Sequence, residues 1–207
     1  MLGFAGQGLF GCRLILQWWL SEKKGFVVSP TVYWYLSLGG SFLFLIYGLL
    51  REDPIIIFGQ FLSFYIYVRN LQLKNAWIQI PLSARIGILI LPLVTIGLLG
   101  DSLARSRNDL FTYFTDPIMI IGGIGQLALN LRFVYQWFVS EKQKTSVLPF
   151  GFWFISTWAS VLVIVYALFH PIYEIEPVLL VSQGLGIVVY IRNMILASRS
   201  SKKPENV

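Results

Sequence analysis

The chain has 207 residues, of which 56% are hydrophobic and 13% are charged, and its formal net charge is +6. A soluble domain usually carries about 25% charged residues. Here the apolar residues come in blocks of about 17 to 22, the length that crosses ~30 Å of hydrocarbon. The composition therefore excludes most soluble enzyme folds and predicts an integral membrane protein. In such a protein a positive charge indicates cytoplasmic loops, so we expect no nucleic acid as a partner.

Seven helical spans are expected along the chain, because an unpaired backbone amide is too costly inside a lipid bilayer. Polar stretches separate the apolar blocks, and a proline stands at the start of several of them, where its missing N–H costs nothing. The first apolar block has no basic stretch before it, so we interpret it as a retained span and not as a signal peptide. The predicted spans are residues 4–20, 31–50, 54–73, 84–100, 117–139, 148–169 and 177–197.

The loops of a protein with seven spans would differ strongly in charge between the two sides. The side with the N-terminus receives Arg51, Arg105 and Arg107 against seven acidic residues, whereas the other side receives most of the lysines. Lysine and arginine collect on the cytoplasmic side of bacterial membrane proteins. The sequence therefore predicts the bacterial inner membrane, with a periplasmic N-terminus and a cytoplasmic C-terminus.

The beginning and the end of the chain are copies of one another. Residues 13–23 recur as residues 132–142 at a shift of 119, and residues 54–70 recur as residues 177–193 at a shift of 123. Two parallel copies of three helices need one extra span between them. We therefore predict an all-α fold of 3+1+3 spans, in which two parallel three-helix-bundle repeats are joined by a linker helix. The expected domains are the first repeat (4–73), the linker helix and polar linker (74–116), the second repeat (117–197) and a cytoplasmic tail (198–207).

Polar side chains inside the predicted spans are candidates for function, because each is costly in lipid. Arginine suits paired hydrogen bonds to phosphate, so we expect these groups to bind an anionic headgroup or a solute. A structural use as ion pairs and interhelical hydrogen bonds stays open beside it. The candidate ligands are Arg13, Gln17, Arg69, Asn70, Arg132, Gln136, Arg192 and Asn193. The candidate lining of a path is Gln7, Gln60, Tyr67, Gln126, Gln183 and Tyr190.

Motifs for catalysis and for metal binding are lacking in the sequence. The one histidine and the one cysteine, His170 and Cys12, cannot form a metal site of the usual spacing. The sequence contains neither a phosphate-binding glycine loop of the Walker type nor a G-x-S-x-G motif, and no pair of carboxylates lies within a predicted span. We expect no catalytic residue, no metal and no cofactor, and the sequence does not favour an enzyme.

A composite motif occurs in both copies and resembles the lipid A biosynthesis N-terminal domain family. It reads Arg-x3-Gln-Trp-x2-Ser-Glu-Lys, then Pro-x3-Trp-x2-Ser, then Asp or Glu followed by Pro-x5-Gln-x6-Tyr-x-Arg-Asn. The resemblance covers about two-thirds of the chain. It implies a relation to the three-helix bundles of PQ-loop and SWEET-type proteins. The family is named after its fusion to lipid A disaccharide synthase, but only a short polar tail follows Asn193, so we expect no glycosyl transfer from these residues.

The resemblance implies a role in the biosynthesis of lipid A, lipopolysaccharide or a related glycolipid. The protein would bind or reorient an anionic lipid or saccharide-lipid, or it would dock the cytoplasmic glycosyltransferase of the pathway. Two alternatives stay open. One is a SWEET-like facilitator that passes a small sugar or another polar solute between the two repeats, and the other is a non-transporting membrane anchor for a partner enzyme.

Overall fold

The computed structural model describes residues 2–51, 54–99, 117–169 and 177–200. The predicted all-α fold is confirmed in these ranges, which form seven α-helices and one short 3-10 turn. Each helix ends within four residues of the end of a predicted span. The elements are α1 (Leu2–Lys24), α2 (Thr31–Arg51), α3 (Pro54–Leu73), η1 (Trp77–Gln79), α4 (Leu82–Leu99), α6 (Pro117–Gln143), α7 (Phe150–Phe169) and α8 (Pro177–Ser200).

Four of the described helices are long and apolar enough to cross a membrane. They are α2, α4, α7 and the part of α8 from Leu180 to Arg199. The sequences of α1, α3 and α6 contain the glutamine, arginine and asparagine residues of the repeated motif, which lower their mean hydropathy. The helices are therefore those of a membrane protein, while the number of seven spans stays a prediction.

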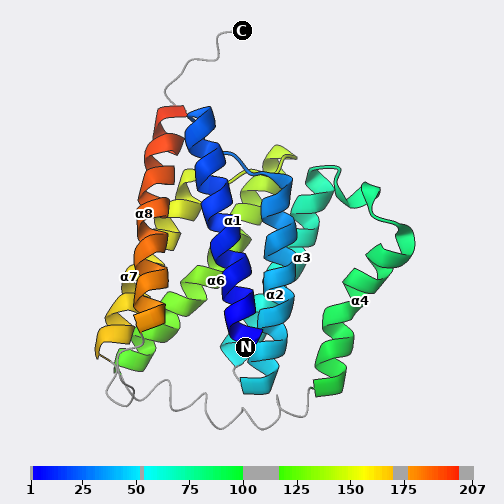
Figure 1. Cartoon of the computed structure of the whole chain (residues 1–207), viewed down its shortest axis with the longest axis horizontal. Coiled ribbons are helices and arrows are strands. Elements are labelled where there is room, and N and C mark those ends of the chain that lie inside the picture. The colour runs from blue at the N-terminus through cyan, green and yellow to red at the C-terminus, as the bar shows by residue number, and fades with distance from the viewer. Residues whose placement is uncertain (1, 52–53, 100–116, 170–176, 201–207) are drawn as a thin grey trace.

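The helices form two groups of three that lie side by side (Figure 1). In the first group α2 packs between α1 and α3, and in the second group α7 packs between α6 and α8. The groups meet along two seams, one between α3 and α6 and the other between α1 and α8. Helix α4 lies to the side and contacts α2, with only 6% of its residues buried. Such an exposed apolar helix is expected to be covered by lipid or by another protein.

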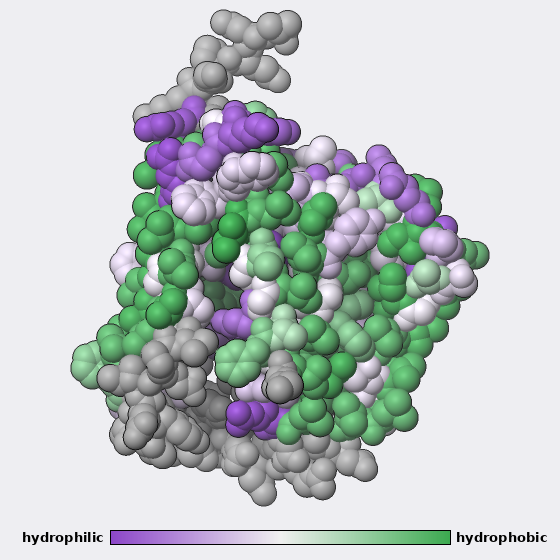
Figure 2. All heavy atoms as spheres, viewed as in Figure 1, coloured by the Kyte–Doolittle hydropathy of each residue, from purple (hydrophilic) through white to green (hydrophobic). Residues whose placement is uncertain are grey.

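Helices α1 and α6 run in the same direction and end on the same side of the molecule, the upper side in Figure 1. Lys23, Lys24 and Lys142 lie in their last turns, and Arg199 lies in the last turn of α8. We call this side the basic end, and hydrophilic residues gather there in Figure 2. The predicted polar linker of residues 101–116, His170 and the tail from residue 201 lie outside the described residues.

The core between the helices is aromatic and follows the repeat. Trp34 and Trp153 are fully buried at equivalent positions of α2 and α7. Their rings lie 5.9 Å from Tyr67 and 6.0 Å from Tyr190, respectively, between ring centroids. The same residues thus make the same packing contact in both copies, which sets the two tyrosines at equal depth beside the space between the groups.

Candidate functional site

A cavity of about 880 Å³ lies between the two groups of helices. It extends from Tyr47 and Tyr166, near the end opposite to the basic end, past Arg13 and Arg132 to Trp18. All six residues that the sequence suggested as the lining of a path contribute to its wall: Gln7, Gln60, Tyr67, Gln126, Gln183 and Tyr190. These six residues, three from each repeat, therefore face one shared space.

Arg13 points into this cavity from the middle of α1 and is buried. Its Nη1 donates a hydrogen bond to Ser37 Oγ at 2.6 Å and another to the Tyr67 hydroxyl at 3.2 Å. Its Cζ lies 4.2 Å from the ring centroid of Phe10 and 5.2 Å from that of Phe133. These neutral partners stabilise the cation through its N–H groups and through the ring faces, but they do not cancel its charge.

Arg132 occupies the equivalent position on α6 and is also buried. Its Cζ lies 5.0 Å from the ring centroid of Phe133, 5.3 Å from that of Phe152 and 5.5 Å from that of Tyr190. Within the described residues, its buried Nε and Nη1 have no hydrogen-bond partner. A buried polar group left unpaired costs about 1–3 kcal/mol. A ligand that brought acceptors to these atoms would therefore be favoured.

Three further polar groups in the cavity wall are also unpaired within the described part of the chain: Gln60 Oε1, Asn130 Nδ2 and Trp153 Nε1. The described ranges contain two acidic residues, Glu22 and Glu141, and neither lines the cavity. As far as the structure describes it, the cavity thus holds positive charge and free hydrogen-bonding groups without a carboxylate. That combination suits an anion with several oxygen atoms.

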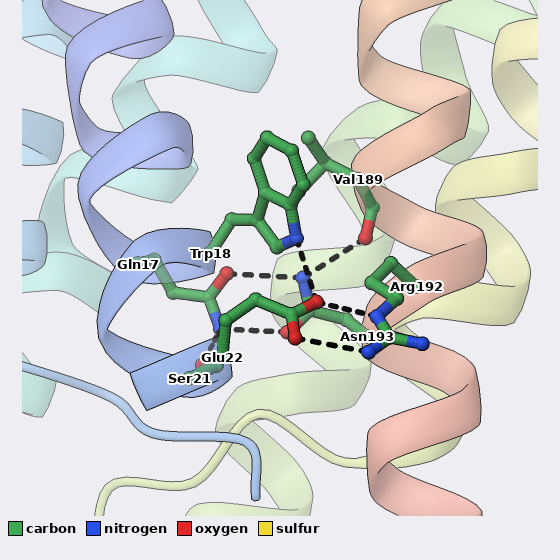
Figure 3. A network of polar contacts seen from close by, with 7 residues as sticks. All are labelled: Gln17, Trp18, Ser21, Glu22, Val189, Arg192 and Asn193. Carbon is green, nitrogen blue, oxygen red and sulfur yellow. Dashed lines mark hydrogen bonds and ion pairs between the residues drawn. The ribbon is translucent and has the colours of Figure 1, made fainter. Parts of the chain in front are cut away.

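The other predicted ligands lie outside the cavity, in two equivalent clusters near the basic end. In the cluster between α1 and α8, Gln17 Nε2 donates to Asn193 Oδ1 at 2.8 Å, and Asn193 Nδ2 donates to Gln17 Oε1 at 3.2 Å (Figure 3). Arg192 donates to Glu22 from Nε and, at 3.0 Å, from Nη2. Trp18 Nε1 adds a hydrogen bond to Glu22 at 3.1 Å. This cluster joins the first helix of one copy to the last helix of the other.

The cluster between α3 and α6 repeats this arrangement. Gln136 Nε2 donates to Asn70 Oδ1 at 2.8 Å, and Asn70 Nδ2 donates back to Gln136 Oε1 at 3.1 Å. Arg69 donates to Glu141 from Nε and from Nη2, both at 2.8 Å. Lys144 Nζ donates to the same carboxylate at 2.8 Å. The amide side chains of both clusters are fully buried, so each closes its seam on the basic side of the cavity.

The ion pairs of the two clusters shift the titration of both acids. The hydrogen bonds from Arg192 hold the pKa of Glu22 below its usual value. Those from Arg69, with help from Lys144, lower the pKa of Glu141 to about 2. Both carboxylates are therefore charged at neutral pH. Because both pairs are partly exposed to solvent, each adds only a small amount to stability.

The structure thus divides the eight predicted ligands into two sets. Arg13 and Arg132 face the cavity, while the other six bind one another or a glutamate in the clusters. Three residues outside the predicted set, Ser63, Asn130 and Ser182, also line the cavity, and their polarity inside a predicted span is the signal that marks them. Among the described residues no group of histidine, cysteine or acidic side chains could hold a metal ion.

Known proteins that are similar to this chain all point to one family. Residues 2–72 and 121–195 match the family model of the Lipid A Biosynthesis N-terminal domain. The chain is 28% identical over 202 residues to the lipid-A-disaccharide synthase of Chlamydia pneumoniae, an alignment that covers 93% of this chain and 32% of that protein. It is 28% identical over 218 residues to the protein of the same name from Chlamydia trachomatis serovar D, covering 98% of this chain and 35% of that one.

The lipid-A-disaccharide synthase of Chlamydia felis is 27% identical over 216 residues, which cover 99% of this chain and 34% of that protein. The chain therefore spans about a third of the length of these curated relatives. No solved structure matches it. Because the two matched segments together make up more than half of the sequence, the chain belongs to the Lipid A Biosynthesis N-terminal domain family.

Proposed function

We propose that this chain binds the anionic headgroup of a lipid in its central cavity, as a step in the biosynthesis of lipid A or a related glycolipid. The observation that carries the proposal is the pair of buried arginines, Arg13 and Arg132, in a cavity whose described lining contains no carboxylate. A buried charge is costly unless an opposite charge accompanies it. A phosphate or carboxylate headgroup would supply that charge and would accept hydrogen bonds from the unpaired N–H groups of Arg132.

The membrane setting of this proposal follows from charge. All seven helices would span the bacterial inner membrane as 3+1+3, with repeats over residues 4–73 and 117–197, the linker over 74–116 and a cytoplasmic tail over 198–207. The positive-inside rule would place the basic end in the cytoplasm and the N-terminus in the periplasm. The cavity would then lie on the periplasmic side of the two clusters, at a depth that suits the reorientation of a lipid headgroup.

The name shared by the curated relatives supports a partner on the cytoplasmic side. These relatives are called lipid-A-disaccharide synthases, and this chain corresponds to about a third of their length. We propose a glycosyltransferase of lipid A assembly as the partner that would dock at the basic end. Pull-down from native membranes tests this part, and a chain that is recovered without such an enzyme counts against it.

The headgroup site is tested by lipid binding to the purified full chain in detergent, measured by native mass spectrometry with phosphatidic acid and with phosphatidylcholine. We expect the wild type to prefer phosphatidic acid. Arg132→Gln should weaken that binding by about tenfold, since a hydrogen bond to a charged group contributes about 1.5–3 kcal/mol. The double variant Arg13→Gln/Arg132→Gln should weaken it by about a hundredfold.

Arg199→Gln serves as the matched control, because Arg199 is an exposed arginine at the end of α8 and lies outside the cavity lining. It should bind phosphatidic acid like the wild type. Circular dichroism checks that each variant keeps its helix content. If the double variant binds phosphatidic acid as tightly as the wild type, the headgroup site is refuted.

A second candidate function is the facilitated passage of a small polar solute, such as a sugar. It is favoured by the four glutamines that line the cavity from both repeats, Gln7, Gln60, Gln126 and Gln183. Amide side chains both donate and accept hydrogen bonds, which suits hydroxyl groups. Uptake of labelled sugars into proteoliposomes measures this activity. Flux no greater than in empty vesicles would rule it out for the sugars tested.

A further inference from the structure

The two seams between the copies correspond to one another in sequence but are not equally closed. At the α3–α6 seam, a Cβ built on Gly59 would lie 2.2 Å from Asn130 Nδ2, so the amide side chain fills the contact. At the α1–α8 seam, the repeat places Ser182 at the position equivalent to Gly59 and Gly11 at the position equivalent to Asn130. Gly11 is exposed, and a Cβ built on it would meet no atom of the described residues within 4 Å. Glycine in place of asparagine thus leaves the second seam open at this depth.

The residues around Gly11 show the same difference. Ile15, Leu185 and Val188 line the cavity, and yet they are 62%, 65% and 58% exposed, respectively. Their counterparts at the other seam are half-buried and do not belong to the cavity lining: Val134, Leu62 and Tyr65. The cavity therefore opens sideways between α1 and α8, past apolar side chains. Figure 2 shows the hollow between these two helices, with hydrophilic residues inside it.

The cluster of Gln17, Glu22, Arg192 and Asn193 limits this opening on one side. It binds α1 to α8 near the basic end (Figure 3). Gly11 lies six residues before Gln17, or about 9 Å along the helix axis. The seam is therefore closed at the basic end and open in the half of the molecule that lies away from it.

We propose that the α1–α8 seam is a lateral portal through which a lipid with an anionic headgroup enters the cavity from the bilayer. This inference rests on the proposed function, because Arg13 and Arg132 receive the headgroup. The acyl chains remain between Ile15 and Leu185, whose apolar surfaces suit alkyl chains, and continue into the membrane. A water-soluble solute would not enter through an opening on the apolar flank of the protein, because that opening faces hydrocarbon. A lipid needs such an opening so that its acyl chains stay out of water.

The portal is tested with a photoreactive residue at its edge. Benzoylphenylalanine replaces Ile15 in one protein and Phe58 in a control, since Phe58 is also 62% exposed but does not line the cavity. Both proteins are placed in vesicles with radiolabelled phosphatidic acid or radiolabelled phosphatidylcholine. The photoreactive residue in place of Ile15 should capture about tenfold more phosphatidic acid than the one in place of Phe58, because one charge-assisted hydrogen bond contributes about this factor in affinity. Phosphatidylcholine should be captured equally at both positions.

A second pair of variants blocks the portal. Gly11→Trp places a large ring in the opening, while Gly87→Trp places the same ring on α4, at an exposed position whose Cβ also meets no described residue within 4 Å and which lies outside the cavity lining. We expect Gly11→Trp to slow the exchange of phosphatidic acid between vesicles and protein by at least about tenfold. Gly87→Trp should exchange it like the wild type.

The outcomes separate the portal from the headgroup site. The portal is refuted if the photoreactive residue in place of Ile15 captures phosphatidic acid no better than the one in place of Phe58, or if Gly11→Trp exchanges this lipid at the wild-type rate. This holds even where the arginine variants lose binding. If Ile15 shows its excess and the excess persists in Arg13→Gln/Arg132→Gln, lipid enters the seam but the arginines do not hold its headgroup. The portal and the headgroup site stand together only if the excess is present in the wild type and disappears in the double variant.

Discussion

Two polar layers cross the helices at different depths, and they differ in how far their hydrogen-bonding groups are paired. Near the basic end, the side-chain amides of Gln17 and Gln136 are fully hydrogen-bonded, and no buried side-chain atom of the two clusters is unpaired in the described residues. In the cavity, Arg132 and Asn130 keep unpaired donors and Gln60 keeps an unpaired acceptor. Buried polar groups are nearly always paired in folded proteins. The first layer therefore holds the two copies together, whereas the second leaves hydrogen-bonding groups free for the headgroup that we propose it binds.

The two layers lie close together and come from the same motif. Arg13 and Gln17 are four residues apart on α1, about 6 Å along the helix axis. One turn of the helix thus separates a residue that offers charge to the cavity from a residue that closes the seam. The same pair recurs as Arg132 and Gln136 on α6, so each copy contributes one member to each layer. Mutations in the two layers should therefore have opposite effects on stability.

The largest effect on stability is expected in the paired layer. Gln136→Leu leaves Asn70 without its partner on α6 and removes a hydrogen bond of 2.8 Å to the Val147 carbonyl. Because these groups stay buried, the free energy of unfolding should fall by about 2–3 kcal/mol. Unfolding of the purified chain in detergent, followed by circular dichroism, measures the change.

Gln143→Leu is the matched control, since Gln143 is the exposed last residue of the same helix. Its free energy of unfolding should stay within about 0.5 kcal/mol of the wild type. Equal losses in the two variants would show that the buried amide pair does not stabilise the contact between the copies.

The helices are predictable because their signals are local. The length of each apolar block and the prolines at several helix starts are read from neighbouring residues, and every described helix ends within four residues of a predicted span. The repeat in the sequence also pairs Arg13 with Arg132 and Gln60 with Gln183, and all four residues line one cavity. Sequence equivalence between the copies thus predicts which residues share a depth and a role.

The pairing between the copies is not predictable in the same way. Gln17 and Asn193 are 176 residues apart, and no periodicity relates them. The sequence therefore groups both with the arginines as ligands, although interhelical hydrogen bonding is among the structural uses that it leaves open. The available signal is chemical: each copy carries Gln and Glu at the end of its first helix and Arg-Asn at the end of its third, two complementary pairs. The difference between Gly11 and Asn130 is also visible in the repeat, but its effect on the seam depends on how the helices pack.

A change of opposite sign is expected in the unpaired layer. Arg132→Met removes a buried charge whose Nε and Nη1 are unpaired within the described residues and replaces it with an apolar side chain. Such replacements commonly stabilise, so the ligand-free chain in detergent should gain about 1–2 kcal/mol. The same variant should lose most of the stabilisation that phosphatidic acid gives to the wild type.

The midpoint of thermal unfolding, with and without phosphatidic acid, measures both effects. A variant that is less stable than the wild type without lipid would mean that the rings of Phe133, Phe152 and Tyr190 already satisfy the cation. In that case Arg132 would belong with the paired layer, and the contrast between the layers would be lost.

The smallest effect concerns pH and the ion pair of Glu141 with Arg69. The pKa of Glu141 is lowered from 4.5 to about 2, so the folded state binds fewer protons than the unfolded state between these values. The pair therefore stabilises the fold above about pH 4.5 and loses this contribution as the pH falls toward 2. Because the pair is partly exposed, the change in the unfolding midpoint should be small.

Glu141→Gln should flatten the pH dependence of the midpoint in this window, whereas Gln143→Leu should keep the dependence of the wild type. An unchanged pH dependence in Glu141→Gln would show that the seam between α3 and α6 is held at its basic end by the buried pair of Asn70 and Gln136 alone.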